Sequence, residues 1–145
     1  IRLRKPGVRK VGKALGLPES IFARPPFPGP ALAARVIGEV TPARVATVRA
    51  AISIVEEELA SSGAFQYLAI LHEDRVTGMR EGQREFGEQI EVRCWDSTDA
   101  RSGTFTRLDY EVLARLASRI TTEVEGIVSV TYGITSKPPS TIEAV

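Results

Sequence analysis

Apolar residues recur every three to four positions in three segments of the chain, which is the spacing of amphipathic helices. The first predicted helix is short and ends before Gly16. The second begins with Thr41 as its cap and ends at Gly63, and the third is expected to be capped by Thr106 and closed by Gly126. The apolar stripes are Val8, Val11 and Leu15; Val45, Val48, Ile52, Val55 and Leu59; and Leu113, Leu116, Ile120 and Val124.

Three other segments have the patterns of strands. Residues 65–71 form a short apolar run, and residues 85–95 and 128–134 alternate apolar with polar positions. The polar, glycine-containing stretch 73–84 is expected to be a connecting loop. The order of these elements predicts an α+β two-layer sandwich, with a small antiparallel three-stranded sheet backed by two long helices.

Composition narrows the class of protein without naming a function. The chain has 145 residues, 43% of them hydrophobic and 26% charged, which is typical of a soluble globular domain. Its single cysteine, Cys94, cannot form an internal disulfide and lies on the apolar side of a predicted strand, so we expect a buried thiol. No apolar run is long enough to cross a membrane, and no signal peptide precedes the domain. We therefore expect a cytoplasmic protein without a membrane partner.

The N-terminal end has its own character. The chain begins with Ile1 and its only methionine is Met79, so we expect it to be part of a longer protein. Six basic residues and no acidic residue precede position 14, and four prolines crowd residues 25–30, which marks a linker or domain boundary. The basic segment could contact nucleic acid, but it lacks interleaved aromatic residues, which favours a solvated or interdomain helix face over a nucleic-acid partner.

No catalytic constellation or metal site is predicted. His72 is the only histidine and is expected to be an ordinary surface or strand-end residue, and no phosphate-binding glycine loop is present. The tail at 135–143 is more informative, because Lys137 precedes two prolines and lies between hydroxyl residues. An ammonium group presented from a stiff backbone suits an anion such as phosphate. A rigid C-terminal extension without a ligand is the alternative.

Three stretches together resemble a known family. The sequences RPPFPGP at 24–30, AARVIGEV at 33–40 and TSKPPSTIE at 135–143 resemble the C-terminal domain of glutamine-hydrolysing GMP synthetases, where the patterns are close to HPFPGPGLAIRVLGEV and TSKPPATIEWE. Residues 12–19 resemble the last helix of the ATP-pyrophosphatase domain in that family. The resemblance divides the chain into residues 1–23, the end of that domain or a linker helix, and residues 24–145, a dimerisation domain.

This resemblance implies a place in purine nucleotide synthesis. The family makes GMP from xanthosine 5′-monophosphate (XMP), using ATP, Mg²⁺ and ammonia from a glutaminase. The implied partners are XMP, a second copy of this domain, and ATP-pyrophosphatase and glutaminase domains or subunits. The ATP and Mg²⁺ sites would lie outside these residues, so no cofactor is expected here and the chain alone should be inactive.

The resemblance also assigns roles to individual residues. Lys137 would hold the nucleotide phosphate, Ile142 and Glu143 would complete the pocket, and Gln66 would be another nucleotide contact. These groups suit phosphate oxygens, hydroxyls and base N–H groups. Arg35 would face the pyrophosphatase domain and its active site.

Two departures from the family pattern favour an alternative. Ser129 stands where many members have an arginine that contributes to phosphate binding, and Ala144 and Val145 replace the terminal Trp-Glu. Arg84 or Arg93 could replace the missing charge. Otherwise the chain would be a diverged, non-catalytic paralogue that serves as an oligomerisation module.

Overall fold

A computed structural model of the chain describes residues 5–22, 32–99 and 101–144. The proline-rich segment at 25–30 and the first basic residues lie outside this part of the chain. The helices are α1 (Lys5–Ala14), α2 (Glu19–Phe22), the 3₁₀-helix η1 (Ala33–Arg35), α3 (Pro42–Leu59) and α4 (Tyr110–Glu123). The strands are β1 (Gln66–Arg80), β2 (Gln83–Asp96), β3 (Thr104–Phe105) and β4 (Ile127–Tyr132).

The sheet is mixed and four-stranded, so the expected three-stranded antiparallel sheet is wrong. The long strand β2 pairs antiparallel with β1 and β3, but parallel with β4. The reason is the connection between β2 and β4. Helix α4 carries the chain back across the sheet, so β4 enters at the end where β2 also begins, and a helical crossover of this kind joins parallel strands.

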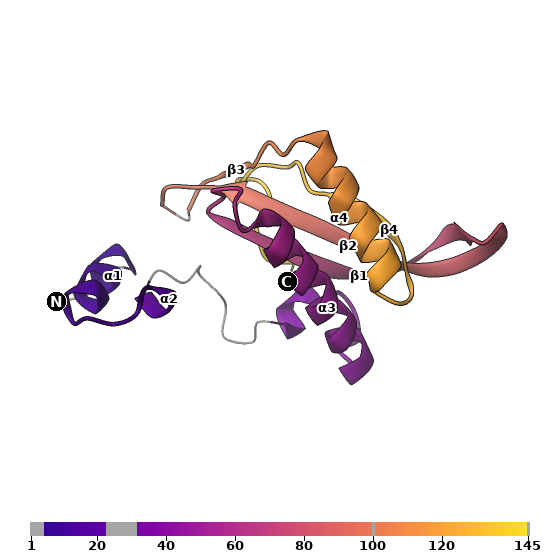
Figure 1. The fold of residues 1–145 in the computed structure, drawn as a ribbon, viewed down its shortest axis with the longest axis horizontal. Helices are drawn as coiled ribbons and strands as arrows, with labels where there is room; N and C mark the ends of the chain where they lie inside the picture. The colour runs from indigo at the N-terminus through magenta and orange to yellow at the C-terminus, as the bar shows by residue number, and fades with distance from the viewer. Residues whose placement is uncertain (1–4, 23–31, 100, 145) are drawn as a thin grey trace.

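The stretch 73–84 is not a loop, as its polar sequence predicted, but a two-stranded arm. Strand β1 continues to Arg80, and only Glu81 and Gly82 turn the chain, with φ angles of 51° and 77°. Positive φ at both positions is the geometry of a type I′ hairpin. Figure 1 shows this arm extending past the ends of α3 and α4. Because the arm is largely solvated, its strands carry no apolar alternation, which is why the pattern failed.

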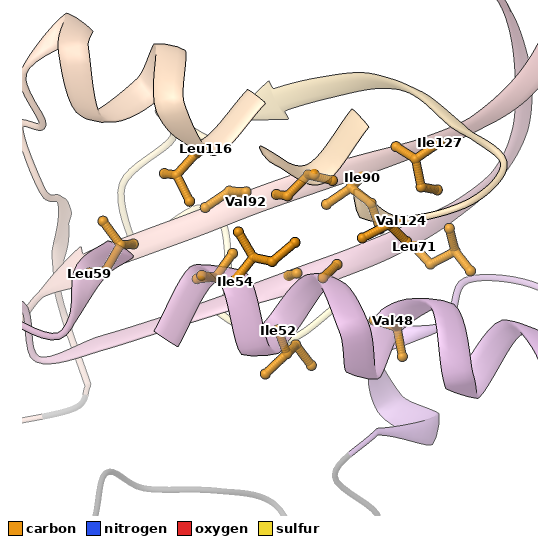
Figure 2. Close-up of a cluster of buried hydrophobic side chains, with 14 of the residues drawn as sticks. Val48, Ile52, Ile54, Leu59, Leu71, Ile90, Val92, Leu116, Val124 and Ile127 are labelled. Carbon is orange, nitrogen blue, oxygen red and sulfur yellow. The ribbon is translucent and has the colours of Figure 1, made fainter. Parts of the chain in front are cut away.

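Four α-helices are present in the described residues, and two of them, α3 and α4, cover one face of the sheet (Figure 1). The Thr41 cap is confirmed, since its hydroxyl accepts a hydrogen bond from the Arg44 N–H at 3.2 Å. Apolar side chains from both helices meet those of the sheet in a single core (Figure 2), to which Val48, Val55, Leu59, Leu71, Ile90, Val92, Leu116, Ile120 and Ile127 contribute.

Two single-residue predictions have opposite outcomes. Cys94 is fully buried, as expected from its place on the apolar side of β2. Thr106 does not cap α4, because Asp109 occupies that position. Instead the Thr106 hydroxyl donates to an Asp96 carboxylate oxygen at 2.8 Å, and its N–H donates to the Cys94 carbonyl. The chain thus stays extended for several residues after β3 before α4 begins.

No helix in the described part of the chain has both the length and the apolar character needed to span a bilayer.

Candidate functional site

A polar groove lies where β2 ends and the C-terminal tail returns to the sheet. Its volume is about 670 Å³, within the range of small-molecule sites. Hydroxyl groups dominate its wall, together with one ammonium group and one carboxylate. The lining residues are Gly63, Phe65, Asp96, Ser97, Thr98, Ser102, Gly103, Thr104, Ser136 and Lys137.

Main-chain pairing fixes Lys137 at the edge of this groove. The Gly103 N–H donates to the Lys137 carbonyl at 3.0 Å, and the Lys137 N–H donates to the Gly103 carbonyl at 2.9 Å. These two bonds join the tail to the loop that follows β2. Lys137 therefore stands among hydroxyl groups on a defined backbone, as its sequence context suggested.

A smaller recess next to the groove brings together three of the predicted site residues. Gln66, Lys137 and Ile142 all line it, although Gln66 begins β1 and the other two belong to the tail. Phe65, Trp95, Ser97 and Ser102 complete its wall, and its volume is about 30 Å³. An amide, an ammonium group and an apolar side chain are thus gathered from two ends of the chain.

Glu143 and Arg35 line neither cavity. Arg35 is almost completely buried, and this burial lowers the pKa of its guanidinium, while the negative charges of Glu143 and Glu56 raise it. One Glu143 carboxylate oxygen is buried without a hydrogen-bond partner among the described residues. The structure therefore places Glu143 as a counter-charge near Arg35, beside the recess and not in its wall.

The two cations considered as replacements for the missing arginine lie elsewhere. Arg84 is on the exposed arm, opposite Met79. Arg93 is committed to the main chain of the tail, where its Nη1 donates to the carbonyls of Thr141 and Glu143 at 2.8 and 3.0 Å. Neither side chain lines the groove or the recess.

Position 129 is also remote from the groove. Ser129 pairs with Gln89, six residues along β2 from Trp95, where the sheet meets the groove (95 − 89 = 6). At 3.3 Å per residue this separation is about 20 Å. An arginine at position 129 would therefore not line the groove, so the serine found there removes no charge from its wall.

The sequence interpretation missed the hydroxyl residues that follow β2. Ser97, Thr98, Ser102 and Thr104 form much of the groove wall. A dense run of Ser, Thr and Gly directly after a strand was the available signal. Chemically, the site can bind a ligand that carries both an anionic group and hydroxyls. The described residues contain no group of three or more His, Cys, Asp and Glu side chains that could hold a metal ion.

Comparison with known proteins identifies the family. Residues 53–144 match the model of the GMP synthase C terminal domain. The chain belongs to this family. Its match covers β1 to β4, α4 and the tail, and so includes Gln66, Lys137, Ile142 and Glu143.

Relatives of the GMP synthase family extend the similarity along nearly the whole chain. The glutamine-hydrolysing GMP synthase of Pyrobaculum aerophilum is 46% identical over 96% of this chain and 28% of its own length. That of Thermomicrobium roseum is 48% identical, over 96% of this chain and 27% of its own. In Thermococcus kodakarensis the relative is one subunit of a glutamine-hydrolysing GMP synthase, and it is 47% identical, over 97% and 47%. The chain thus spans between about a quarter and a half of these relatives.

Proposed function

We propose that this chain is the XMP-binding and dimerisation part of a glutamine-hydrolysing GMP synthase, and that it works in the cytoplasm. The complete enzyme would make GMP from XMP, ATP and ammonia derived from glutamine. The observation that supports this proposal best is the meeting of Gln66, Lys137 and Ile142 in one recess beside a hydroxyl-lined groove.

Each residue has a role that suits a nucleoside monophosphate. The Lys137 ammonium binds the phosphate, and the hydroxyls of Ser97, Ser102 and Ser136 donate to its oxygens. Gln66 hydrogen-bonds a ribose hydroxyl or the base, and Ile142 packs against the nucleotide. The Asp96 carboxylate repels phosphate, so it suits a sugar hydroxyl at the other end of the groove.

We assign neither ATP nor Mg²⁺ to this chain. Its described residues lack a cluster of potential metal ligands, and its sequence lacks a phosphate-binding glycine loop. In the proposal both are bound by the ATP-pyrophosphatase part of the synthase. The Thermococcus kodakarensis relative is named as a subunit, which supports a division of the synthase over separate chains in some organisms. The chain alone should therefore make no GMP.

The test of the nucleotide site is Lys137→Ala in the complete synthase. Loss of a charge-assisted contact of about 1.5 to 3 kcal/mol should raise the KM for XMP ten- to hundredfold, and leave the KM for ATP unchanged. Arg84→Ala is the matched control, since it removes a cation from the arm at the opposite end of β2. A KM for XMP that is the same in Lys137→Ala and the unaltered enzyme would refute the proposed site.

We further propose that the arm takes part in the homodimer contact. Phe86 faces Thr77 across the arm and shares one face with Met79, and these two apolar side chains are 63% and 68% exposed. The other face carries Gly78 and Gly87, which lie against Val128. An exposed apolar pair on a polar arm supports a protein contact.

Sedimentation equilibrium tests the dimer. Phe86→Ser should shift the synthase from dimer toward monomer, whereas Thr77→Ser, on the same face, should leave the dimer intact. A dimer of unchanged affinity in Phe86→Ser would exclude the arm from the interface, and a monomeric unaltered synthase would refute dimerisation itself.

The alternative of an oligomerisation module without nucleotide binding has weaker support. It depended mainly on Ser129, which lies about 20 Å along β2 from the groove end. Dimerisation of the unaltered chain without any XMP binding by the complete synthase would favour this alternative.

A further inference from the structure

Arg93 lies in the middle of the sheet and on the face opposite the helices. Its neighbours Val92 and Cys94 point into the core beneath α3 and α4, so the alternation of a strand directs Arg93 to the other face, as it does Glu91. The Arg93 side chain is only 16% exposed. A guanidinium with so little solvent needs several protein acceptors.

Those acceptors are main-chain carbonyls of the C-terminal tail. Arg93 Nη1 lies 2.8 Å from the Thr141 oxygen, 3.3 Å from the Ile142 oxygen and 3.0 Å from the Glu143 oxygen. One nitrogen thus contacts three successive residues that are about fifty positions away in the sequence. Because all three acceptors are backbone atoms, the contact does not depend on the side chains of the tail.

Glu91 holds the other side of the same guanidinium. Its Oε1 accepts from Arg93 Nε at 2.7 Å and its Oε2 from Arg93 Nη2 at 3.2 Å, which is a two-point contact. His72 Nε2 lies 3.0 Å from Glu91 Oε2. Burial alone would raise the pKa of Glu91, but the hydrogen bonds from Arg93 and His72 lower it. The carboxylate therefore stays ionised and fixes the Arg93 orientation.

There is no spare room around this contact. A Cβ atom on Gly133 would lie 2.7 Å from Glu91 Oε1 and 3.3 Å from Arg93 Cγ. The Gly133 N–H also donates to the Val92 carbonyl at 3.0 Å, so the backbone here cannot simply move away. The chain leaving β4 thus packs directly on the Glu91 and Arg93 side chains.

From these contacts we propose that Arg93 is a positioning residue for the nucleotide site, which acts by holding residues 141–143 of the tail against the sheet. This proposal depends on the proposed function. Arg93 keeps Ile142 in the wall of the recess, and it keeps Glu143 beside Arg35. Because the contact uses carbonyls, it also holds a tail that ends in Ala144 and Val145, where the family pattern has Trp-Glu.

The experiment compares Arg93→Gln, Arg93→Lys and Arg115→Gln in the complete synthase. Arg115 is the matched control, because it makes one ion pair with Glu58 on the far side of the helices and its side chain is 55% exposed. Lysine keeps the charge of Arg93 but lacks the planar fork that contacts Glu91 and three carbonyls together. It also guards against misfolding, since it leaves no unpaired charge on Glu91.

Two readouts separate positioning from a general structural role. Amide hydrogen exchange should be at least about tenfold faster in the tail of Arg93→Gln, with the exchange of α3 and α4 unchanged. The KM for XMP should rise about tenfold or more with a smaller effect in Arg93→Lys, and the KM for ATP should stay the same. Arg115→Gln should match the unaltered enzyme in both measurements.

Three results would overturn the proposal: unchanged exchange in the tail, exchange that accelerates equally in the tail and the helices, or faster tail exchange with an unchanged KM for XMP. Failure of the proposed function has a different signature. In that case Lys137→Ala would leave the KM for XMP unchanged, while the tail of Arg93→Gln would still exchange faster.

Discussion

The main chains of Gly103 and Lys137 form two reciprocal hydrogen bonds, at 3.0 and 2.9 Å, and these bonds join the loop after β2 to the C-terminal tail. The two residues are 34 positions apart (137 − 103 = 34) and the whole of α4 and β4 lies between them. The groove exists because these two segments meet, since each of them supplies part of its wall.

The first prediction concerns Gly103. A Cβ atom at this position would lie 2.8 Å from the Asp96 carbonyl oxygen and 3.0 Å from Trp95 Cε3, so Gly103→Ala must displace the loop. We expect about 1 to 3 kcal/mol lower stability and about tenfold weaker XMP binding. Denaturant unfolding and calorimetric titration of the synthase measure the two effects.

Gly82→Ala is a suitable comparison for this variant. Gly82 has a φ of 77° at the tip of the arm, so alanine there costs about 1 kcal/mol in backbone strain without touching the groove. If Gly103→Ala and Gly82→Ala bind XMP equally well, the bridge to Lys137 does not shape the site.

The second prediction concerns the pH dependence of stability through Glu91. Burial raises the pKa of this carboxyl, but hydrogen bonds from Arg93 and His72 outweigh it and bring the folded-state pKa below the ordinary value of 4.5. The unfolded chain therefore binds the proton first as pH falls. The stabilisation is complete above about pH 5 and is lost as pH falls through the folded-state pKa.

Glu91→Gln should accordingly flatten the fall in unfolding free energy between about pH 5 and pH 3, and cost about 1 to 3 kcal/mol at neutral pH. Urea titrations at several pH values measure both. Glu81→Gln, at the exposed turn of the arm, should keep the original slope. An identical slope in Glu91→Gln would contradict the assignment of this pH dependence to Glu91.

The third prediction concerns Tyr132, which joins β4 to the end of β2. Its hydroxyl donates to the Thr106 carbonyl at 2.6 Å and contacts the Cys94 carbonyl at 3.3 Å. Burial first, and then the negative charges of nearby groups, raise the pKa of this phenol, so it stays a donor throughout the neutral range. Tyr132→Phe leaves a buried carbonyl without its donor and should cost about 1 to 2 kcal/mol.

Thermal and chemical unfolding measure this loss. Tyr110→Phe removes a hydroxyl from a side chain that is 89% exposed, so its stability should equal that of the unaltered protein. Equal stability of Tyr132→Phe and Tyr110→Phe would mean that the bond to Thr106 contributes nothing net.

Local pattern predicted the elements that bury one face. The stripe from Val48 to Leu59 identified α3, and Thr41 marked its start, because the helical period and the cap are both short-range properties. The arm escaped detection since strands that are solvated on both faces have no reason to alternate. The parallel pairing of β4 escaped as well, because it depends on the path of α4 and not on the residues of β4.

By itself, the sequence determined that α3 and α4 form, that Cys94 is buried, and, through the motifs at 33–40 and 135–143, which family the chain resembles. The tertiary structure alone decided that Gln66, Lys137 and Ile142 share one recess, that Glu143 pairs its charge with Arg35 beside it, and that Arg93 holds the tail and does not replace a phosphate ligand. The physical reason is separation along the chain. Helices, caps and burial follow from neighbours a few residues apart, whereas the site is made by segments that only the folding of the sheet brings into contact.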